Sequence, residues 1–175
     1  IYGEVLYKSK ILPPLTTVNG KVIHRDWDYL QYFINEARRL GLKVTVSTAM
    51  FPSGHPATRE GLVYDESRWD GKTCLEYTPD GKMLDIREDK KKVGAFLNPV
   101  RKDVRKFALS IVREIVRNYD VDAYALDYCR YPGDDSDFSA DSRKAFEHYL
   151  GKKVRNFPDC LLYTSPSPRD AHESR

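Results

Sequence analysis

An aspartate and an arginine close a short apolar run in the second half of the chain. The run VDAYALDYCRYPG spans residues 121–133, where Asp127 follows Leu126 directly and Arg130 comes three positions later. A carboxylate placed in this way can act as a general acid or base, or can stabilise a developing charge. Arg130 and Tyr128 could then orient a polar substrate beside it. The same spacing also allows an Asp127–Arg130 salt bridge that only shapes the loop.

Other polar side chains stand where further strands are expected to end. The segment 1–7 is predicted as a short strand and carries Glu4 and Tyr7, and Asn98 closes the extended run 95–99. Glu4 is the second candidate acid, and Tyr7 and Asn98 are candidate substrate-binding residues. No His, Cys, Asp and Glu cluster has the spacing of a metal site, and no glycine-rich phosphate loop follows a strand. We therefore expect neither a metal nor a cofactor.

Composition limits the broad class of the protein. The 175 residues are 41% hydrophobic and 31% charged, with a net charge of +3, which fits one folded core and gives no basic patch for a nucleic acid. No apolar run reaches the roughly 20 residues that a membrane span requires. The cysteines form neither a C-x-x-C pair nor a disulfide framework, and Cys129 is predicted to be a free, packed thiol.

Helices and strands are expected to alternate along the chain. Each helix has a candidate cap, because Asp26, Asn98 and Ser139 each precede an amphipathic segment. Gly41 and Gly151 are expected to end the first and last of these helices. The expected elements in chain order are a strand at 1–7, a helix from Asp26 to Gly41, a strand at 42–51, a helix after Asn98 and Pro99, a strand leading to Asp127, and a helix from Ser139 to Gly151.

A long irregular insertion at 52–94 interrupts this alternation. The Asp-Gly pairs at 70–71 and 80–81 predict one or two hairpins, because Asp-Gly favours tight hairpin turns. Long loops in compact domains are commonly functional. The aromatic residues Tyr64, Trp69 and Tyr77 therefore favour an ordered flap that faces a ligand.

The alternation predicts an α/β fold with a parallel sheet and helical crossovers, as an open doubly wound sheet or as part of an eight-stranded barrel. Alternation along the strand places Asp127 on one face with Ala123 and Ala125, and small inward residues favour the barrel. We expect one domain at 1–159. Residues 160–175 read as a translated transposase-type sequencing adapter, so we expect a non-native, disordered tail there.

Several stretches together resemble the glycosyl-hydrolase-like family 10 domain. They are GEVLYKSKILP at 3–13, ARRLGLKV at 37–44, LNPVRKDVRKF at 97–107 and IVREIVRNYDVDAYALDYCRYP at 111–132. Ala123 stands where the family pattern has a glycine, and Cys129 separates Tyr128 from Arg130. Neither departure alters the aspartate or the arginine of the pattern.

This resemblance implies a partial TIM-type (β/α)8 barrel holding about strands 2–4 with their helices and the inserted loop. A full barrel needs about 250 residues, so we expect the chain to be an incomplete and inactive part of a glycosidase. Glycosidases use two carboxyl groups, here Asp127 and the weaker candidate Glu4. Trp69, with Tyr64 and Tyr77, would suit stacking on sugar faces.

The implied substrate is a bacterial or dietary oligo- or polysaccharide, and the implied location is extracytoplasmic, in the cell envelope or secreted. Two alternatives stay open. One is a non-catalytic carbohydrate-binding or scaffolding barrel, and the other is a TIM-barrel enzyme that acts on a different polar substrate. The oligomeric state is also left open.

Overall fold

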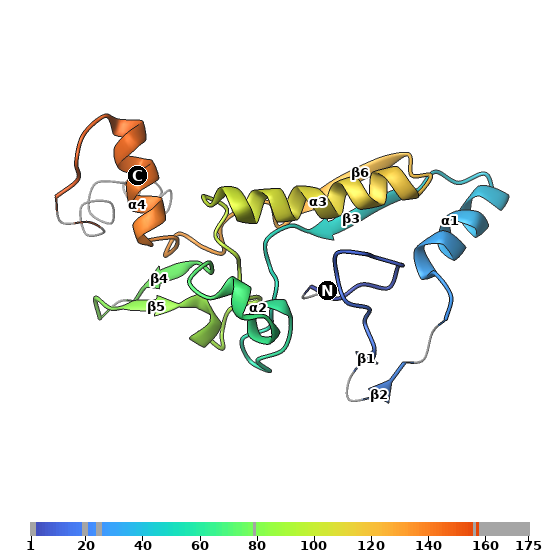
Figure 1. Ribbon diagram of the computed structural model, residues 1–175, viewed down its shortest axis with the longest axis horizontal. Helices are drawn as coiled ribbons and strands as arrows, with labels where there is room; N and C mark the ends of the chain where they lie inside the picture. Colours follow the sequence, from blue (N-terminus) through green and yellow to red (C-terminus); the bar gives the residue numbers. More distant parts are fainter. Residues whose placement is uncertain (1–2, 19–20, 24–25, 79, 156, 158–175) are drawn as a thin grey trace, which may run out of the picture.

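The computed structural model describes residues 3–18, 21–23, 26–78, 80–155 and 157, which form a mixed α/β structure (Figure 1). Its central unit is a parallel strand pair with a helix crossing from one strand to the other. The strands are β1 (Thr17–Val18), β2 (Lys21–Val22), β3 (Thr45–Ala49), β4 (Leu75–Tyr77), β5 (Met83–Asp85) and β6 (Ala123–Asp127). The helices are α1 (Tyr29–Arg39), α2 (Leu62–Asp65), α3 (Lys102–Asn118) and α4 (Ala140–Leu150), with 3₁₀ turns η1 (Ser67–Trp69) and η2 (Ile86–Glu88).

The β3–β6 pair confirms the predicted parallel sheet with a helical crossover. Strand β3 pairs with β6 in parallel, from Thr45 beside Ala123 to Ala49 beside Asp127, and α3 runs along this pair (Figure 1). The described residues contain no closed barrel, since β3 and β6 form a sheet of two strands. The expected tail at 160–175 and the domain boundary at 159 lie outside the described residues.

The segment 1–7 is not a strand where the structure describes it. Val5 forms only an isolated bridge with Pro14, so the chain folds back as a loop. Glu114 on α3 holds this loop: its carboxylate accepts hydrogen bonds from the Lys10 amide at 2.6 Å, the Ser9 hydroxyl at 2.5 Å and the Tyr7 hydroxyl at 3.3 Å. A short loop bonded to a helix side chain therefore replaces the expected strand.

Asp28, and not Asp26, caps α1. Its Oδ1 accepts from the Gln31 amide at 3.0 Å, and its Oδ2 accepts from the Lys8 amide at 3.1 Å and the Tyr119 hydroxyl at 2.5 Å. Burial opposes ionisation, but these hydrogen bonds outweigh it and lower the pKa of Asp28. The cap thus joins α1 to the N-terminal loop and to the end of α3.

Asn98 does not cap α3, which begins only at Lys102. The Asn98 carbonyl accepts from the Arg101 amide and its Oδ1 accepts from the Val100 amide, so residues 98–101 form a turn before the helix. The expectation for the last helix is confirmed: the Ser139 side chain caps α4, and Gly151 ends it in the left-handed conformation with φ +68°. Gly41, with φ +70°, follows the last residues of α1.

Asp137 joins three parts of the chain through one carboxylate. Its Oδ1 accepts from the Leu75 amide of β4 at 2.6 Å, and its Oδ2 accepts from the Asn98 side chain at 2.5 Å. The hydroxyls of Ser139 and Ser142, at the start of α4, donate to the same Oδ2. Asn98 is therefore part of the internal scaffold and is 1% exposed.

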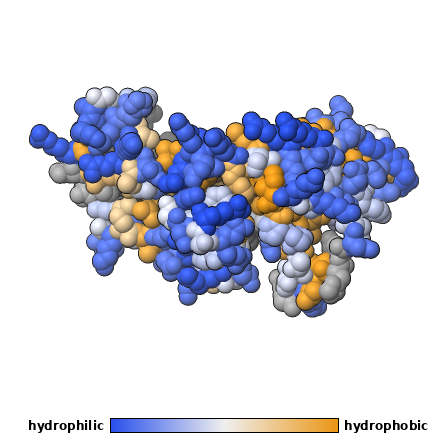
Figure 2. All heavy atoms as spheres, in the orientation of Figure 1, coloured by the Kyte–Doolittle hydropathy of each residue, from blue (hydrophilic) through white to orange (hydrophobic). Residues whose placement is uncertain are grey.

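The buried apolar residues form two clusters. One lies between α3 and the insertion and includes Phe51, Trp69 and Phe96, while the other lies between α1, β3 and α3 and includes Ile34 and Ile115. Figure 2 shows hydrophobic residues emerging in patches between the hydrophilic ones on the face of Figure 1.

The insertion contains one of the two expected hairpins. Strands β4 and β5 pair antiparallel around the Asp80–Gly81 turn, whereas Asp70–Gly71 forms a turn after η1 without flanking strands. Cys129 is a free thiol as predicted, but the prediction that it is packed is wrong, because Cys129 is exposed. Cys74 is the packed thiol, and burial raises its pKa.

The two candidate caps of α1 can be separated by alanine substitution. Asp28→Ala removes the acceptor for the Gln31 amide, so we expect amide exchange at the start of α1 to accelerate about 5- to 30-fold, equivalent to about 1–2 kcal/mol. The matched control Asp26→Ala, on an exposed side chain, should leave exchange unchanged. Hydrogen–deuterium exchange measures both, and equal effects would contradict the assignment.

The contribution of Asp28 should also depend on pH. A pKa lowered on folding stabilises the protein above the ordinary carboxyl value of 3.8, and this stabilisation disappears as the pH falls through the lowered value. We therefore expect the difference in unfolding free energy between wild type and Asp28→Asn to be constant near neutral pH and to shrink as the pH falls below 3.8. Urea titrations at each pH measure it, and a difference that grows on acidification would contradict the role.

Replacing the buried Asn98 should lower stability. Asn98→Ala removes the side-chain amide that donates one hydrogen bond to Asp137 and one to Ser139. Because both acceptors lose this donor, we expect the free energy of unfolding to fall by about 1–3 kcal/mol. The control Asn118→Ala changes an exposed amide at the end of α3 and should have little effect. Urea unfolding followed by circular dichroism measures both, and an unchanged midpoint for Asn98→Ala would refute the scaffold role.

Candidate functional site

A cavity of about 480 Å³ lies at the end of the β3–β6 pair. The N-terminal loop forms one wall, while β3, the end of β6 and α3 form the others (Figure 1). The sequence-predicted residues Glu4, Tyr7, Asp127 and Tyr128 all line it. The structure thus brings together four of the seven site residues that the sequence indicated, from segments that are distant in the chain.

Asp127 is the last residue of β6 and its position is fixed from both sides. Its carbonyl accepts a hydrogen bond from the Met50 amide at 2.9 Å, which continues the β3–β6 ladder by one residue. Its Oδ1 accepts from the Tyr128 amide at 2.8 Å. The carboxylate therefore has a backbone donor, at the end of the strand pair that contributes Asp127 to the cavity lining.

Tyr128 adopts a backbone conformation that is unusual for its residue type. Its φ of +46° lies in the left-handed region, which is costly for a residue with a Cβ and is found at functional sites more often than elsewhere. The ring packs edge-on against Phe96, with centroids 5.9 Å apart, and the Arg130 guanidinium lies 5.0 Å from its centroid. These contacts hold the turn that directly follows Asp127.

Arg130 makes no salt bridge with Asp127 within the described residues. Its guanidinium donates instead to the carbonyl of Tyr131 at 3.0 Å and to that of Pro132 at 3.3 Å. Arg130 is also absent from the described lining of the cavity. The structure thus places Arg130 behind Tyr128, where it supports the ring.

A glycine is needed for Glu4 to reach the cavity. Gly3 has φ +99°, and a Cβ built on it would lie 2.6 Å from the Leu62 Cβ of α2. Only glycine combines that conformation with so close an approach. The glycine at position 3 therefore lets the N-terminal loop pass close to α2, and this brings the half-buried Glu4 to the cavity.

Tyr7 remains neutral at physiological pH. Burial raises the pKa of its phenol, and the negative charge of Glu114 raises it further against the opposing effect of Ser9. Its hydroxyl donates to Glu114, so one partner is already set. Tyr7 offers the cavity a neutral aromatic wall and not a phenolate base.

The charged side chains along the described lining of the cavity are both acidic. They are Glu4 and Asp127, and the lining contains no lysine, arginine or histidine. Hydroxyl groups of Ser47, Thr48 and Ser53 add neutral polar contacts, whereas α3 supplies apolar surface. Such a site suits a neutral substrate with many hydroxyl groups better than an anionic one.

Trp69 lies in the core and not on a ligand-facing flap. It is 4% exposed, its ring packs on Phe107 with centroids 4.6 Å apart, and Arg68 and Lys72 lie near the ring at 4.8 and 5.6 Å from its centroid. Its expected stacking on a sugar is therefore corrected, because the protein already covers the ring. Asn98 is buried and donates a hydrogen bond to Asp137, and it is likewise absent from the described lining of the cavity.

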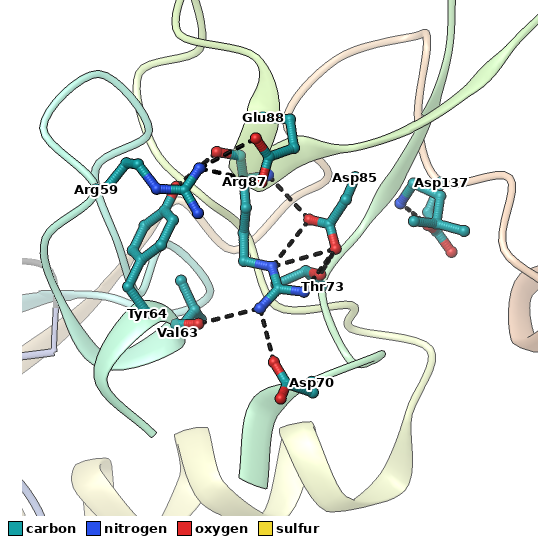
Figure 3. A network of polar contacts seen from close by, with 10 residues as sticks. Arg59, Val63, Tyr64, Asp70, Thr73, Asp85, Arg87, Glu88 and Asp137 are labelled. Carbon is teal, nitrogen blue, oxygen red and sulfur yellow. Dashed lines mark hydrogen bonds and ion pairs between the residues drawn. The ribbon is translucent and has the colours of Figure 1, made fainter. Parts of the chain in front are cut away.

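The other aromatic residues of the insertion are also engaged in packing. Figure 3 shows Tyr64 beside Arg59, whose guanidinium lies 5.3 Å from the ring centroid. The Tyr64 hydroxyl donates to the Arg87 carbonyl at 2.9 Å, and Tyr77 meets Phe138 edge-on at 6.0 Å. The expected flap is thus an internally bonded unit.

Arg87 is the centre of that unit (Figure 3). Its guanidinium bonds to Asp85, to Asp70 at 2.8 Å and to the Val63 carbonyl at 3.3 Å, and the hydrogen bonds with Asp85 raise its pKa. The Thr73 hydroxyl donates to the same Asp85 carboxylate at 2.9 Å. One arginine therefore bonds α2, η1 and β5 together.

Sequence reasoning missed Tyr29 as a lining residue and Glu114 as the anchor of the loop. A helix glutamate with three partners more than 100 residues away has no local signal. In the part of the chain that the structure describes, no group of His, Cys, Asp and Glu could hold a metal ion. The described helices include none that could cross a membrane.

Comparison with known proteins gives two matches. The model of the glycosyl hydrolase-like 10 family matches residues 2–160. The chain is also 37% identical over 169 residues to an S-layer-related protein of Niallia circulans. That match covers 91% of this chain and 10% of the relative, so the chain spans about a tenth of the relative's length.

The family model includes the whole of the cavity described above, from the N-terminal loop to the turn after β6. The likeness recognised in the sequence motifs is thereby confirmed. Since the match extends over nearly the entire chain, this protein belongs to the glycosyl hydrolase-like 10 family.

Proposed function

We propose that this domain is the substrate-binding and catalytic part of a glycoside hydrolase that acts on a neutral polysaccharide. The observation that carries the proposal is the convergence of the strand-end acid Asp127 and the loop acid Glu4 on one cavity with hydroxyl-bearing and aromatic walls. Hydrolysis of a glycosidic bond uses such a pair of carboxyl groups. Family membership supports the same reaction class.

In this proposal the two acids divide the chemistry between them. One protonates the leaving oxygen, while the other either activates water or attacks the anomeric carbon to form a glycosyl-enzyme that water then hydrolyses. In both cases one sugar unit gains the hydroxyl of water and the other gains a proton. The Tyr128 and Met50 amides fix the position of Asp127. Tyr7 and Tyr128 form the walls against which a sugar ring can lie, and Arg130 positions Tyr128.

The wider architecture that we propose is a part of a TIM-type barrel, about its strands 2–4. The face of the β3–β6 pair that bears Asp127 carries only small side chains, and all of them are exposed: Thr45, Ser47, Ala49, Ala123 and Ala125. Small residues of this kind suit the interior of a barrel. Because a barrel takes about 250 residues, we propose that hydrolysis requires the longer protein and that this chain alone is inactive.

A second candidate function is that of a non-catalytic carbohydrate-binding or scaffolding domain. The name of one relative, an S-layer-related protein, favours this second candidate. By extension we propose an extracytoplasmic location for this domain, for either function. The two functions differ in turnover and not in binding.

The role of Asp127 can be tested in the full-length protein. Asp127→Asn keeps the size of the side chain but removes its acid–base capacity, so we expect hydrolysis to fall about 10²- to 10⁴-fold on the glycans that wild type cleaves. The matched control is Asp134→Asn, an exposed aspartate in the following loop, which should retain full activity. Reducing-end release on a panel of neutral glycans measures the rates.

Each outcome of this test has a defined meaning. Unchanged hydrolysis by Asp127→Asn, with folding verified by circular dichroism, would remove Asp127 from catalysis. Binding of a glycan by wild type without any release of reducing ends would favour the scaffolding function. Neither binding nor release on the whole panel would refute a carbohydrate substrate.

The acidic lining predicts discrimination against anionic glycans. A uronic acid or sulfated sugar would place its negative charge near Glu4 and Asp127, so we expect weaker binding than for a neutral glycan of the same linkage. Added salt should reduce this difference, because it screens charge repulsion. Affinity electrophoresis at low and high salt measures it, and a preference for the anionic glycan would contradict the assigned cavity.

A further inference from the structure

A second cavity shares a wall with the first. Its volume is about 730 Å³, and five residues of the N-terminal loop line both cavities: Val5, Leu6, Tyr7, Leu12 and Leu15. Its remaining lining includes Lys8 and Trp27, from the loop and from the approach to α1. The two cavities are therefore neighbours that share a wall built by the N-terminal loop.

An aromatic cluster connects the rims of the two cavities. Trp27 lines the second cavity and Tyr29 lines the first, and their ring centroids are 5.7 Å apart. Tyr32, one turn along α1, packs edge-on against Trp27 with centroids 5.4 Å apart. The three side chains are 44%, 42% and 59% exposed in the order Trp27, Tyr29 and Tyr32. We call these three residues the α1 aromatic cluster.

This exposure distinguishes the α1 aromatic cluster from the aromatic residues of the insertion. Trp69 is buried, and Tyr64 and Tyr77 are partly buried and packed against protein side chains, whereas the α1 aromatic cluster keeps about half of its surface in contact with solvent. Flat aromatic faces flanked by polar groups are the usual platform for the apolar faces of sugar rings. Here the flanking polar groups are Lys8, Ser9 and Asp26.

We infer that the α1 aromatic cluster is a distal sugar-binding subsite, which holds further units of a polymeric glycan whose cleaved unit lies in the cavity at Asp127. This inference rests on the proposed function and specifies its substrate as a chain long enough to extend across the Val5–Tyr7 wall. The continuity of the two cavities through Tyr29 and Trp27 sets the direction of that chain. A short oligosaccharide would fill the first cavity without reaching Trp27.

The inference predicts that the α1 aromatic cluster affects long substrates and not short ones. In the full-length protein, Trp27→Ala should lower kcat/KM about tenfold on a neutral polysaccharide, chiefly through KM, as expected for the loss of one stacking contact. It should leave kcat/KM unchanged on the disaccharide or trisaccharide of the same linkage. Tyr32→Ala should show the same pattern with a smaller effect. The probes are cellulose, xylan, mannan, starch and chitin with their matching short oligosaccharides.

Tyr149→Ala is the matched control. Tyr149 is 85% exposed on α4, at the opposite end of the molecule from α1 (Figure 1), so its removal should change neither long nor short substrates. Binding is measured in parallel in the Asp127→Asn background by affinity electrophoresis, where we expect Trp27→Ala to weaken retention of the polymer about tenfold. This measurement does not require turnover.

The outcomes separate the inference from the proposed function. Equal losses on long and short substrates, or no loss on either, would overturn the subsite. Retention of the polymer that depends on Trp27, in a protein that cleaves nothing, would support the subsite while refuting hydrolysis. Cleavage that depends on Asp127 but is indifferent to Trp27 would support hydrolysis and refute the subsite.

Discussion

The parallel pairing of β3 with β6 is the interaction on which the rest of the structure depends. Parallel neighbours cannot be joined by a tight turn, so the chain between them must cross over, and α3 covers the pair as a result. Asp122 sets the beginning of the pair: its Oδ2 accepts from the Val44 amide at 2.7 Å and from the Arg38 guanidinium at 2.6 Å. These two bonds lower the pKa of Asp122 and attach α1 to the same strand pair.

The register of that pair decides where Asp127 lies. With Ala49 beside Asp127 and the Met50 amide bonded to its carbonyl, the last ladder bond ends at the residue that bears the carboxylate. A shift by one residue would turn Asp127 to the opposite face, towards α3, where an unpaired carboxylate would be costly to bury. The register of the pair therefore determines on which face Asp127 lies and keeps its side chain exposed.

The cavity also depends on a partner far away in sequence. Glu114 lies on α3 and holds the loop of residues 7–12 by hydrogen bonds. Tyr7 and Leu12 of this loop line both cavities. Hydrogen bonds to a charged acceptor are stronger than neutral ones, which explains how a segment with a single isolated bridge keeps its place. The insertion contributes Pro52 and Ser53 to the described lining of the cavity, whereas the side chains around Arg87 bond to one another.

Local and periodic features of the sequence determined much of the architecture. The α3 face, the Ser139 cap and Gly151 stop of α4, the Asp80–Gly81 hairpin and the position of Asp127 at a strand end were all predictable, since each depends on neighbouring residues or on a period of two or 3.6. The family motifs could also be recognised from the sequence, because each is a contiguous stretch of residues. Asp26 was predicted as the cap in place of Asp28 because both are aspartates before the same helix. The bonds that Asp28 accepts from Gln31, Lys8 and Tyr119 identify it as the cap.

Only the tertiary structure decided which polar and aromatic side chains face the cavity. Asn98 and Trp69 have residue types that suit a sugar site, yet Asp137 and Phe107 engage them inside the protein. Glu4 reaches the cavity because Gly3 passes close to α2, and Tyr29 does so because α1 packs beside the loop. The sequence by itself thus determined the elements and the terminal acid, whereas contacts between segments 20 to more than 100 residues apart, which no local pattern encodes, determined the surroundings of that acid.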